Sequence, residues 1–208
     1  MLDGLARTFI DPPLNHIGRK LAGRGVTANM VTGAGLTFSL LAALAIAFQQ
    51  FGFGLLLVIA SRLADGLDGA VARATQKTDF GGYFDIVADF LFYGSVPLAF
   101  AIADPSANAV ATAILLLSFY FNGATFLGYA ILAERNRLTT DLRGQKNFYF
   151  TDGLMEGTET IVFMLIILIW PASYVWAAVI FAAATFFTGV SRMFRARQVF
   201  AAMNRDQT

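Results

Sequence analysis

Residues 65–89 read DGLDGAVARATQKTDFGGYFDIVAD and hold five of the fourteen carboxylates of the chain, between two stretches that are almost wholly apolar. Asp65 and Asp68 are three residues apart and therefore share one face of a helix. Asp85 and Asp89 are four apart and share a face of a second helix, and the polar run between the two pairs predicts the connecting turn. If the helices pack side by side, four mutually repelling carboxylates meet at one end of the pair. Bound divalent cations are the expected solution.

The ligand types restrict which cation is expected. The chain has no cysteine, and its one histidine, His16, is distant in sequence. A site made of oxygen atoms suits Mg²⁺, Mn²⁺ or Ca²⁺ and argues against structural zinc. Two such ions, about 3.5–4 Å apart, typically hold the attacking and leaving oxygens in a displacement at phosphorus. Space for a nucleotide or diphosphate beside the carboxylates is expected at the small residues Gly66, Gly69, Ala70, Ala72, Gly81 and Gly82.

The stretch resembles the signature of the CDP-alcohol phosphotransferase family, class I. That pattern runs Asp, two residues, Asp-Gly, two residues, Ala-Arg, a spacer, Gly, three residues, Asp, three residues, Asp. It is filled in order by Asp65, Asp68, Gly69, Ala72, Arg73, Gly81, Asp85 and Asp89. The chain departs from the pattern in one respect: seven residues separate Arg73 from Gly81, where eight or nine are usual. The resemblance therefore implies the same carboxylates on a shorter turn.

The resemblance implies a reaction and a set of roles. A CDP-linked lipid, first of all CDP-diacylglycerol, gives its phosphatidyl group to the hydroxyl of a small polar alcohol and CMP is released. Two ions, Mg²⁺ or Mn²⁺, are bound by Asp65, Asp68 and Asp85, while Asp89 is shared between metal binding and general-base catalysis. The CMP moiety is lined by Gly69, Ala72, Arg73 and Gly81. Family members are commonly homodimers, so a homodimer is expected here by analogy.

Composition agrees with a membrane enzyme of one domain. The chain has 208 residues, of which 57% are hydrophobic and 14% charged, and its mean hydropathy is +0.62. These values are typical of polytopic membrane proteins. The net charge of +1, without a long basic run, gives no indication of a nucleic-acid partner.

Hydropathy predicts an all-α integral membrane protein with six transmembrane helices, preceded by an amphipathic helix at the membrane interface. The 37 residues from Gly25 to Ser61 carry no charge and are too long for one span of about 20 residues. The predicted spans are residues 30–48, 55–74, 80–102, a segment within 105–133, 151–169 and 172–191. In this division residues 1–25 form the interfacial segment, with a stripe of Leu14, Ile17 and Leu21. Residues 26–197 form the bundle, and residues 198–208 form a cytoplasmic tail.

Polar residues at the start of the first span allow two interpretations. Family members often have a Pro-Asn pair followed by a hydroxyl residue at this point, and Ala28 takes the place of the proline here. Asn29 and Thr32 are therefore expected to help bind the nucleotide. Simple capping of the helix explains Thr27, Asn29 and Thr32 nearly as well.

The loops predict an orientation. Residues 49–54, 103–108 and 170–174 would lie on one side of the membrane and contain no Lys or Arg. The fifteen basic residues fall on the opposite side or in helix ends that reach it. By the positive-inside rule that side is cytoplasmic, in a bacterial inner membrane, and the carboxylate cluster opens toward it.

A second acidic group begins the fifth span, and its role stays open. Asp152, Glu156 and Glu159 could pair with Arg143 or Lys146. They could instead select a cationic acceptor such as an amino or quaternary ammonium alcohol, together with the aromatic residues 148–150. The basic residues of the preceding linker would suit a phosphorylated acceptor instead; these are Arg135, Arg137, Arg143 and Lys146.

Two other classes of protein use similar carboxylates. A metal-dependent membrane phosphatase or phosphodiesterase has the same kind of cluster but uses water as the nucleophile. A cation transporter also places carboxylates between helices, usually near the midplane and at broken helices. The predicted site lies instead at the cytoplasmic end of continuous helices, which makes the transporter the weaker alternative.

Overall fold

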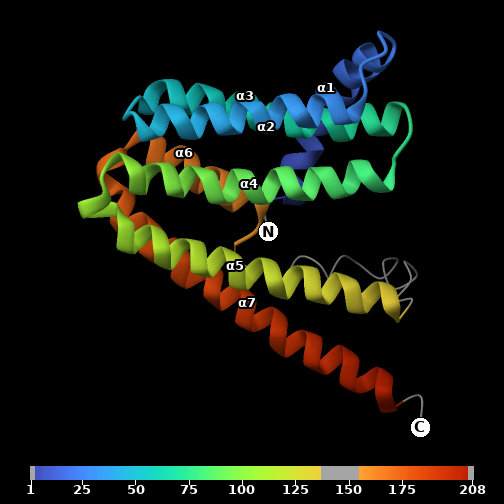
Figure 1. Ribbon diagram of the computed structural model, residues 1–208. Coiled ribbons are helices and arrows are strands. Elements are labelled where there is room, and N and C mark those ends of the chain that lie inside the picture. Colours follow the sequence, from blue (N-terminus) through green and yellow to red (C-terminus); the bar gives the residue numbers. More distant parts are fainter. Residues whose placement is uncertain (1–2, 137–154, 206–208) are drawn as a thin grey trace.

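The structure is a computed structural model that describes residues 3–136 and 155–205. These residues are almost wholly helical (Figure 1). In chain order the elements are α1 (Asp3–Ala22), α2 (Ala28–Ala47), α3 (Phe51–Ala74), α4 (Asp79–Ala103), α5 (Pro105–Arg135), α6 (Gly157–Ile169), the 3-10 turn η2 (Pro171–Ser173) and α7 (Tyr174–Arg205).

The helices after α1 lie close to the predicted spans, and the all-α membrane fold is confirmed. Within the described residues, four segments are long and apolar enough to cross a membrane: α2, α4, α5 and residues 171–201. Helix α3 is long enough but carries four charged residues, and α6 has only 13 residues. The count of six spans therefore stays a prediction.

Several helix ends differ from the predicted ones. Helix α6 begins at Gly157 rather than at residue 151, because Glu156 and Glu159 form a capping box there. The first four residues of that predicted span lie outside the described part of the chain. Helix α7 continues past residue 191 to Arg205, through most of the segment predicted as a tail.

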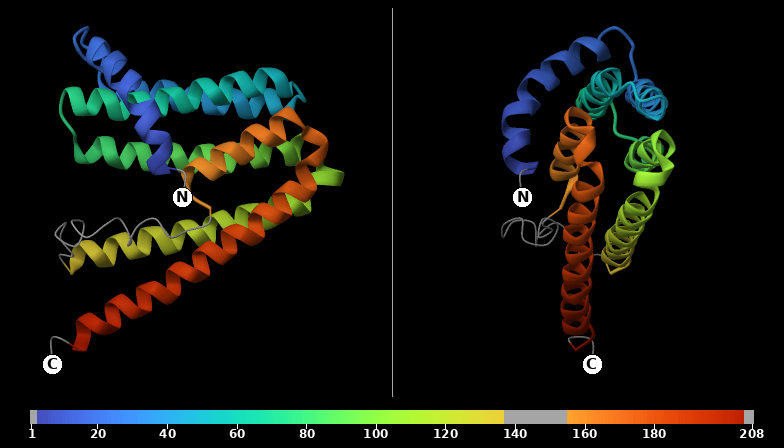
Figure 2. Two further views of the ribbon diagram at one scale, coloured as in Figure 1. Left: turned by 180° about the vertical axis from the view of Figure 1, so that it is seen from behind. Right: turned by 90° about the vertical axis from the view of Figure 1, so that its left-hand side faces the viewer.

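The order of packing brings distant helices together. Helix α2 packs against both α3 and α4, α4 against α5, and α5 along α7 (Figures 1 and 2). The turns α2–α3, α4–α5 and α6–α7 lie at one end of the bundle, and the α3–α4 turn lies at the other (Figure 1). Asp104 caps α5 at the first end, where hydrogen bonds from the Ser106 hydroxyl and the Ala107 amide lower its pKa. Thr78 caps α4 at the second end by accepting a hydrogen bond from the amide of Gly81.

The apolar core has two parts. The larger part joins α2 to α7, and on α4 it extends from Phe92 to Phe100. Tyr174 anchors it: its ring stacks on Phe100 with centroids 4.2 Å apart, and its hydroxyl lies 2.6 Å from that of Thr112. The smaller part joins α1, α2 and α3 near the α3–α4 turn. Asp85 and Asp89 precede Phe92 along α4 and therefore lie beyond the end of the larger part.

Helix α1 packs against α3 rather than only lying on a membrane surface. It contains Pro12 and Pro13 in its interior, and it crosses α3 obliquely (Figure 2). The side chain of Leu14 is buried, whereas Ile17 is 44% exposed, so the predicted apolar stripe does not pack as one face.

The contact between α1 and α3 depends on small residues. A Cβ on Gly18 would lie 2.7 Å from the Cβ of Ala70, and one on Gly66 would lie 2.7 Å from Cδ1 of Leu14. Gly66 and Ala70 therefore contact α1. The expectation that these two positions provide open space for a nucleotide is wrong, because their lack of bulk serves helix packing.

Candidate functional site

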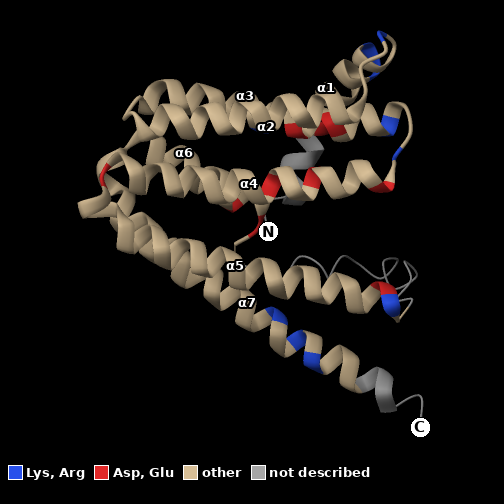
Figure 3. Ribbon diagram, viewed as in Figure 1, with Lys and Arg blue, Asp and Glu red and all other residues tan. Residues whose placement is uncertain are grey.

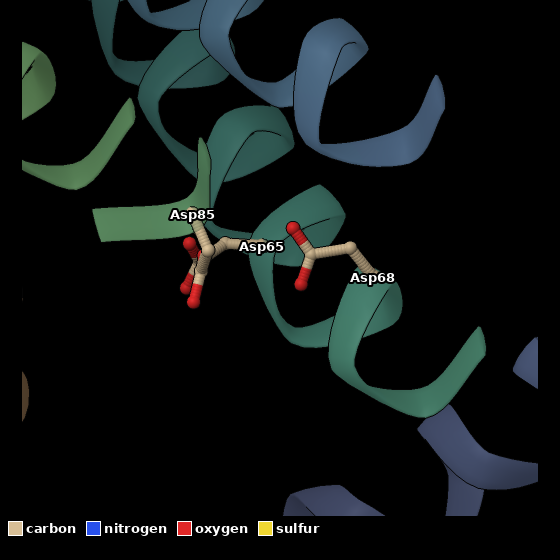
Figure 4. A group of neighbouring side chains, drawn as sticks. All are labelled: Asp65, Asp68 and Asp85. Carbon is tan, nitrogen blue, oxygen red and sulfur yellow. The ribbon is translucent and has the colours of Figure 1, made fainter. Parts of the chain in front are cut away.

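Three of the predicted carboxylates converge between α3 and α4. One oxygen from each of Asp65, Asp68 and Asp85 lies within 4.8 Å of the other two. Figure 4 shows the carboxylates of Asp65 and Asp85 beside one another, with that of Asp68 facing them. Asp68 is 6% exposed, and the other two are half-buried. Carboxylate oxygens alone make a donor set that fits Mg²⁺ or Mn²⁺.

The distribution of charge agrees with this placement. In Figure 3 the acidic positions of α3 and α4 lie on facing segments of the two helices. Basic positions gather toward the same end of the bundle, around the α3–α4 turn, at the end of α5 and within the second half of α7. A polyanionic substrate with bound cations matches such a site.

Helix α2 contributes side chains to both halves of the motif. The hydroxyl of Thr32 donates a hydrogen bond of 2.6 Å to Oδ2 of Asp68, and Oδ1 of Asn29 lies 3.2 Å from where a Cβ on Gly81 would be. Thr27 caps α2, because its Oγ1 accepts a hydrogen bond from the amide of Met30. Capping therefore explains Thr27, while Asn29 and Thr32 lie beside the motif.

The remaining motif positions lie at the C-terminal end of α3 and the N-terminal end of α4. Arg73 is exposed and donates from Nε and Nη2 to Oδ1 of Asn15 on α1, at 3.1 and 2.9 Å. A Cβ on Gly69 would meet only the flexible end of Arg73, at 3.3 Å, and Gly82 has open space around it. Ala72 is half-buried on the same turn of helix. These positions can accommodate a nucleotide.

Asp89, the fourth carboxylate of the motif, pairs with an arginine of α3. Its Oδ1 accepts a hydrogen bond of 2.7 Å from Nη1 of Arg62. The sequence interpretation gave Arg62 no role. It is the first charged residue after the apolar run that ends at Ser61, and it lies three residues before Asp65. That spacing, which puts the two on one helix face, was the signal that could have identified it.

The second acidic group is only partly described. The amide of Glu156 donates a hydrogen bond of 3.2 Å to Glu159, within the capping box of α6. Glu156 also interacts electrostatically with Arg192 of α7, which donates 2.9 Å to Oδ1 of Asn122. The predicted partners and neighbours lie outside the described residues: Arg137, Arg143, Lys146, residues 148–150 and Asp152. Capping of α6 is thus a third role for Glu156 and Glu159, beside pairing and headgroup selection.

Comparison with protein families gives a match over most of the chain. Residues 25–190 match the family model described as CDP-alcohol phosphatidyltransferase. The chain belongs to this family. It is therefore a CDP-alcohol phosphatidyltransferase, a membrane-embedded transferase of phospholipid biosynthesis, as the motif indicated.

Relatives of this phosphatidyltransferase include proteins with and without a stated reaction. It is 37% identical over 206 residues to inner membrane protein YnjF of Escherichia coli K12, covering 99% of this chain and 100% of that one. It is 39% identical over 98 residues to the archaetidylinositol phosphate synthase of Pyrococcus horikoshii, covering 46% of this chain and about half, 52%, of that one.

Solved structures share the fold. The phosphatidylinositol phosphate synthase of Mycobacterium tuberculosis with CDP-DAG bound has a TM-score of 0.69 at 24% identity, covering 88% of this chain and 92% of that one. The same synthase in complex with manganese and citrate has a TM-score of 0.70 at 23% identity, covering 88% of both chains.

Proposed function

We propose that this phosphatidyltransferase moves the phosphatidyl group of CDP-diacylglycerol to the hydroxyl of a small polar alcohol and releases CMP, with two divalent cations, Mg²⁺ or Mn²⁺. The observation that carries the proposal is the convergence of Asp65, Asp68 and Asp85, whose oxygens lie within 4.8 Å of one another. The donor and the cation are supported by the Mycobacterium tuberculosis synthase, whose structures hold CDP-DAG and manganese.

The chain's own residues would hold both parts of the donor. Asp65, Asp68 and Asp85 bind the cations, which, when bound, neutralise the diphosphate and stabilise the charge that develops on its oxygens. The nucleotide lies along the C-terminal end of α3 and the N-terminal end of α4. There it contacts Gly69, Ala72, Arg73, Gly81 and Asn29. Thr32 contributes through Asp68 by fixing the orientation of that carboxylate.

The reaction is a displacement at the phosphorus that bears the diacylglycerol group. The acceptor oxygen forms a bond to this phosphorus, and the bond from the same phosphorus to the oxygen that bridges to CMP breaks. The acceptor hydroxyl gives its proton to Asp89, and CMP leaves as the anion. A positioned base of this kind contributes about 10²–10⁴ in rate.

The orientation in the membrane, the oligomeric state and the acceptor are supported by different observations. The active site faces the cytoplasm of an inner membrane, supported by the absence of Lys and Arg from residues 49–54, 103–108 and 170–174 and by the inner membrane relative. A homodimer is proposed on family analogy. A phosphorylated polyol as acceptor is supported by the relative that makes archaetidylinositol phosphate.

One assay tests the proposal. Purified protein in detergent or nanodiscs receives CDP-diacylglycerol with Mg²⁺ or Mn²⁺ and a panel that includes glycerol phosphate, inositol phosphate, serine and choline, and CMP is measured. The expected result is CMP release that depends on one acceptor, with a matching phospholipid product. CMP formed equally without any acceptor would show hydrolysis rather than transfer, and no CMP under any condition would exclude CDP-diacylglycerol as the donor.

A further inference from the structure

Arg73, the arginine of the motif, is held by a residue of helix α1. It lies in the last turn of α3, and it is exposed. Both Nε and Nη2 donate a hydrogen bond to Oδ1 of Asn15, at 3.1 and 2.9 Å. One oxygen of α1 therefore occupies the edge of the guanidinium that Nε and Nη2 form.

Helix α1 is fixed against α3 on both sides of Asn15. Leu14 and Gly18 are both buried in this contact. A Cβ on Gly18 would lie 2.8 Å from the backbone carbonyl carbon of Ala70, and one on Gly66 would lie 2.7 Å from Cδ1 of Leu14. Packing this close leaves α1 little freedom to slide or rotate on α3. The side chain of Asn15 therefore lies beside the end of α3 in a defined position.

The third nitrogen of the guanidinium lies over the nucleotide positions. Within the described residues, a Cβ on Gly69 would come within 4 Å of one side-chain atom, Nη1 of Arg73, at 3.3 Å. The guanidinium is always charged, and its donors lie in one plane at fixed angles. An anchored Nε–Nη2 edge therefore also fixes the direction in which Nη1 can donate. That direction is across Gly69, on the side of α3 proposed to line the nucleotide.

The contact with Asn15 lowers the entropic cost of using Arg73 as a ligand. An exposed arginine samples many rotamers in water, and ordering it when a ligand binds reduces affinity. A hydrogen bond that forms before the ligand arrives removes part of this cost. A different role is that a positive charge in the last turn of α3 stabilises the end of the helix. That role needs no contact with Asn15, so the two roles can be separated.

We infer that Asn15 is a positioning residue for the nucleotide half of the donor. It holds the Nε–Nη2 edge of Arg73 and leaves Nη1 over Gly69, where it donates to the bound nucleotide. The inference rests on the proposed function, in which Arg73 lines the nucleotide. It extends the site to α1, which precedes the segment 25–190 that matches the family model.

Asn15→Leu tests the inference, because leucine keeps the size of the side chain and removes the acceptor oxygen. The Kd for CDP, measured by isothermal titration calorimetry on purified protein with Mg²⁺, should rise about threefold to tenfold. The KM for donor in the CMP-release assay should rise by a similar factor. The kcat should change by less than about twofold, since contacts with the nucleotide are made equally in the ground and transition states. His16→Leu, at an exposed neighbouring position of α1, is the matched control and should leave both constants near those of the wild type.

A double-mutant cycle separates positioning from damage to α1. In the Arg73→Gln background, Asn15→Leu should change the Kd for CDP by less than about twofold, because the residue through which Asn15 acts is already absent. An equal fold-change in both backgrounds would overturn the inference and show that Asn15 only docks α1. An unchanged or lower Kd in Asn15→Leu alone would also overturn it, since Arg73 would then need no support from Asn15.

The inference and the proposed function fail separately. If the wild type releases no CMP from CDP-diacylglycerol, the proposed donor is wrong, and the CDP titrations still test the role of Asn15. If the wild type does not bind CDP, the inference is overturned whatever the acceptor panel shows. If Asn15→Leu does not fold, Asn15→Ala carries the same expected rise in Kd, because it removes the same acceptor with the residue that forms helices best.

Discussion

The hydroxyl of Thr32 on α2 donates a hydrogen bond of 2.6 Å to Oδ2 of Asp68 on α3. The same hydroxyl lies 3.1 Å from the carbonyl of Ala28, and both Thr32 and Asp68 are buried. Helix α2 packs against both α3 and α4, so it is the helix through which the two halves of the motif are held relative to one another. Through Thr32, helix α2 forms a direct hydrogen bond to one of the motif carboxylates.

Thr32→Val should weaken metal binding while leaving the fold intact. The valine has nearly the same shape, but Asp68 loses the donor that fixes its orientation, and such supporting bonds are typically worth about 10–100-fold in metal affinity or activity. The half-saturating Mg²⁺ or Mn²⁺ concentration for CMP release is the measurement. Thr37→Val is the matched control, because Thr37 is an exposed residue of the same helix that bonds only to the carbonyl of Gly33. An equal change in both variants would contradict the role given to Thr32.

Asp65→Asn, Asp68→Asn and Asp85→Asn should each lower activity by about a hundredfold or more, or sharply raise the metal requirement. Each replaces a charged ligand whose contribution is several kcal/mol, and 1.4 kcal/mol corresponds to a factor of ten. Titration of CMP release with Mg²⁺ and Mn²⁺ measures the effect. Asp79→Asn, at an exposed position in the first turn of α4, is the control. Near-normal metal dependence in all three variants would refute the metal site.

Asp89→Asn should retain donor binding and lose at least about a hundredfold in kcat, because the amide keeps the shape and one acceptor oxygen but cannot take the proton. Binding of CDP-diacylglycerol in the presence of metal and single-turnover CMP release separate the two quantities. A variant that binds donor poorly but reaches normal kcat at saturation would show that Asp89 is a metal ligand and that the base lies elsewhere.

The capping box at the start of α6 predicts how its carboxylates respond to substitution. Glu159→Gln should preserve thermal stability and acceptor preference, because glutamine can still accept the bond from the amide of Glu156. Glu159→Ala should cost about 1 kcal/mol in the free energy of unfolding. Thermal unfolding and the acceptor panel provide the readouts. A changed order of acceptors in Glu159→Gln, with unchanged stability, would instead assign this residue to headgroup selection.

The orientation predicts labelling by a membrane-impermeant thiol reagent added to intact cells. Ser106→Cys and Ser173→Cys should react from outside, and Lys77→Cys, in the exposed α3–α4 turn, should react only after permeabilisation. The chain has no native cysteine to confuse the result. Reaction of Lys77→Cys from outside would invert the topology and place the carboxylates away from cytoplasmic nucleotide.

Local sequence determined the helices and the motif. Charge-free runs such as residues 25–61 predict spans, and i,i+3 and i,i+4 spacing assigns the carboxylates to helix faces without knowledge of any neighbour. Both are properties of single helices, which is why the bounds of α2 and α4 agree closely with the predicted spans. The convergence of Asp65, Asp68 and Asp85 followed once α3 and α4 were assumed to face one another.

Tertiary structure alone decided which faces meet. Leu14 of α1 fills the space at Gly66, and Thr32 of α2 donates a hydrogen bond to Asp68. Both contacts depend on how three helices pack, and the residue spacing within a single helix cannot predict them. The same holds for Arg62, which lies among the carboxylates on sequence spacing yet pairs with Asp89 because Phe92 and Ser61 leave its guanidinium one orientation. A buried charge takes its partner from the three-dimensional surroundings, since desolvation makes every unsatisfied alternative costly.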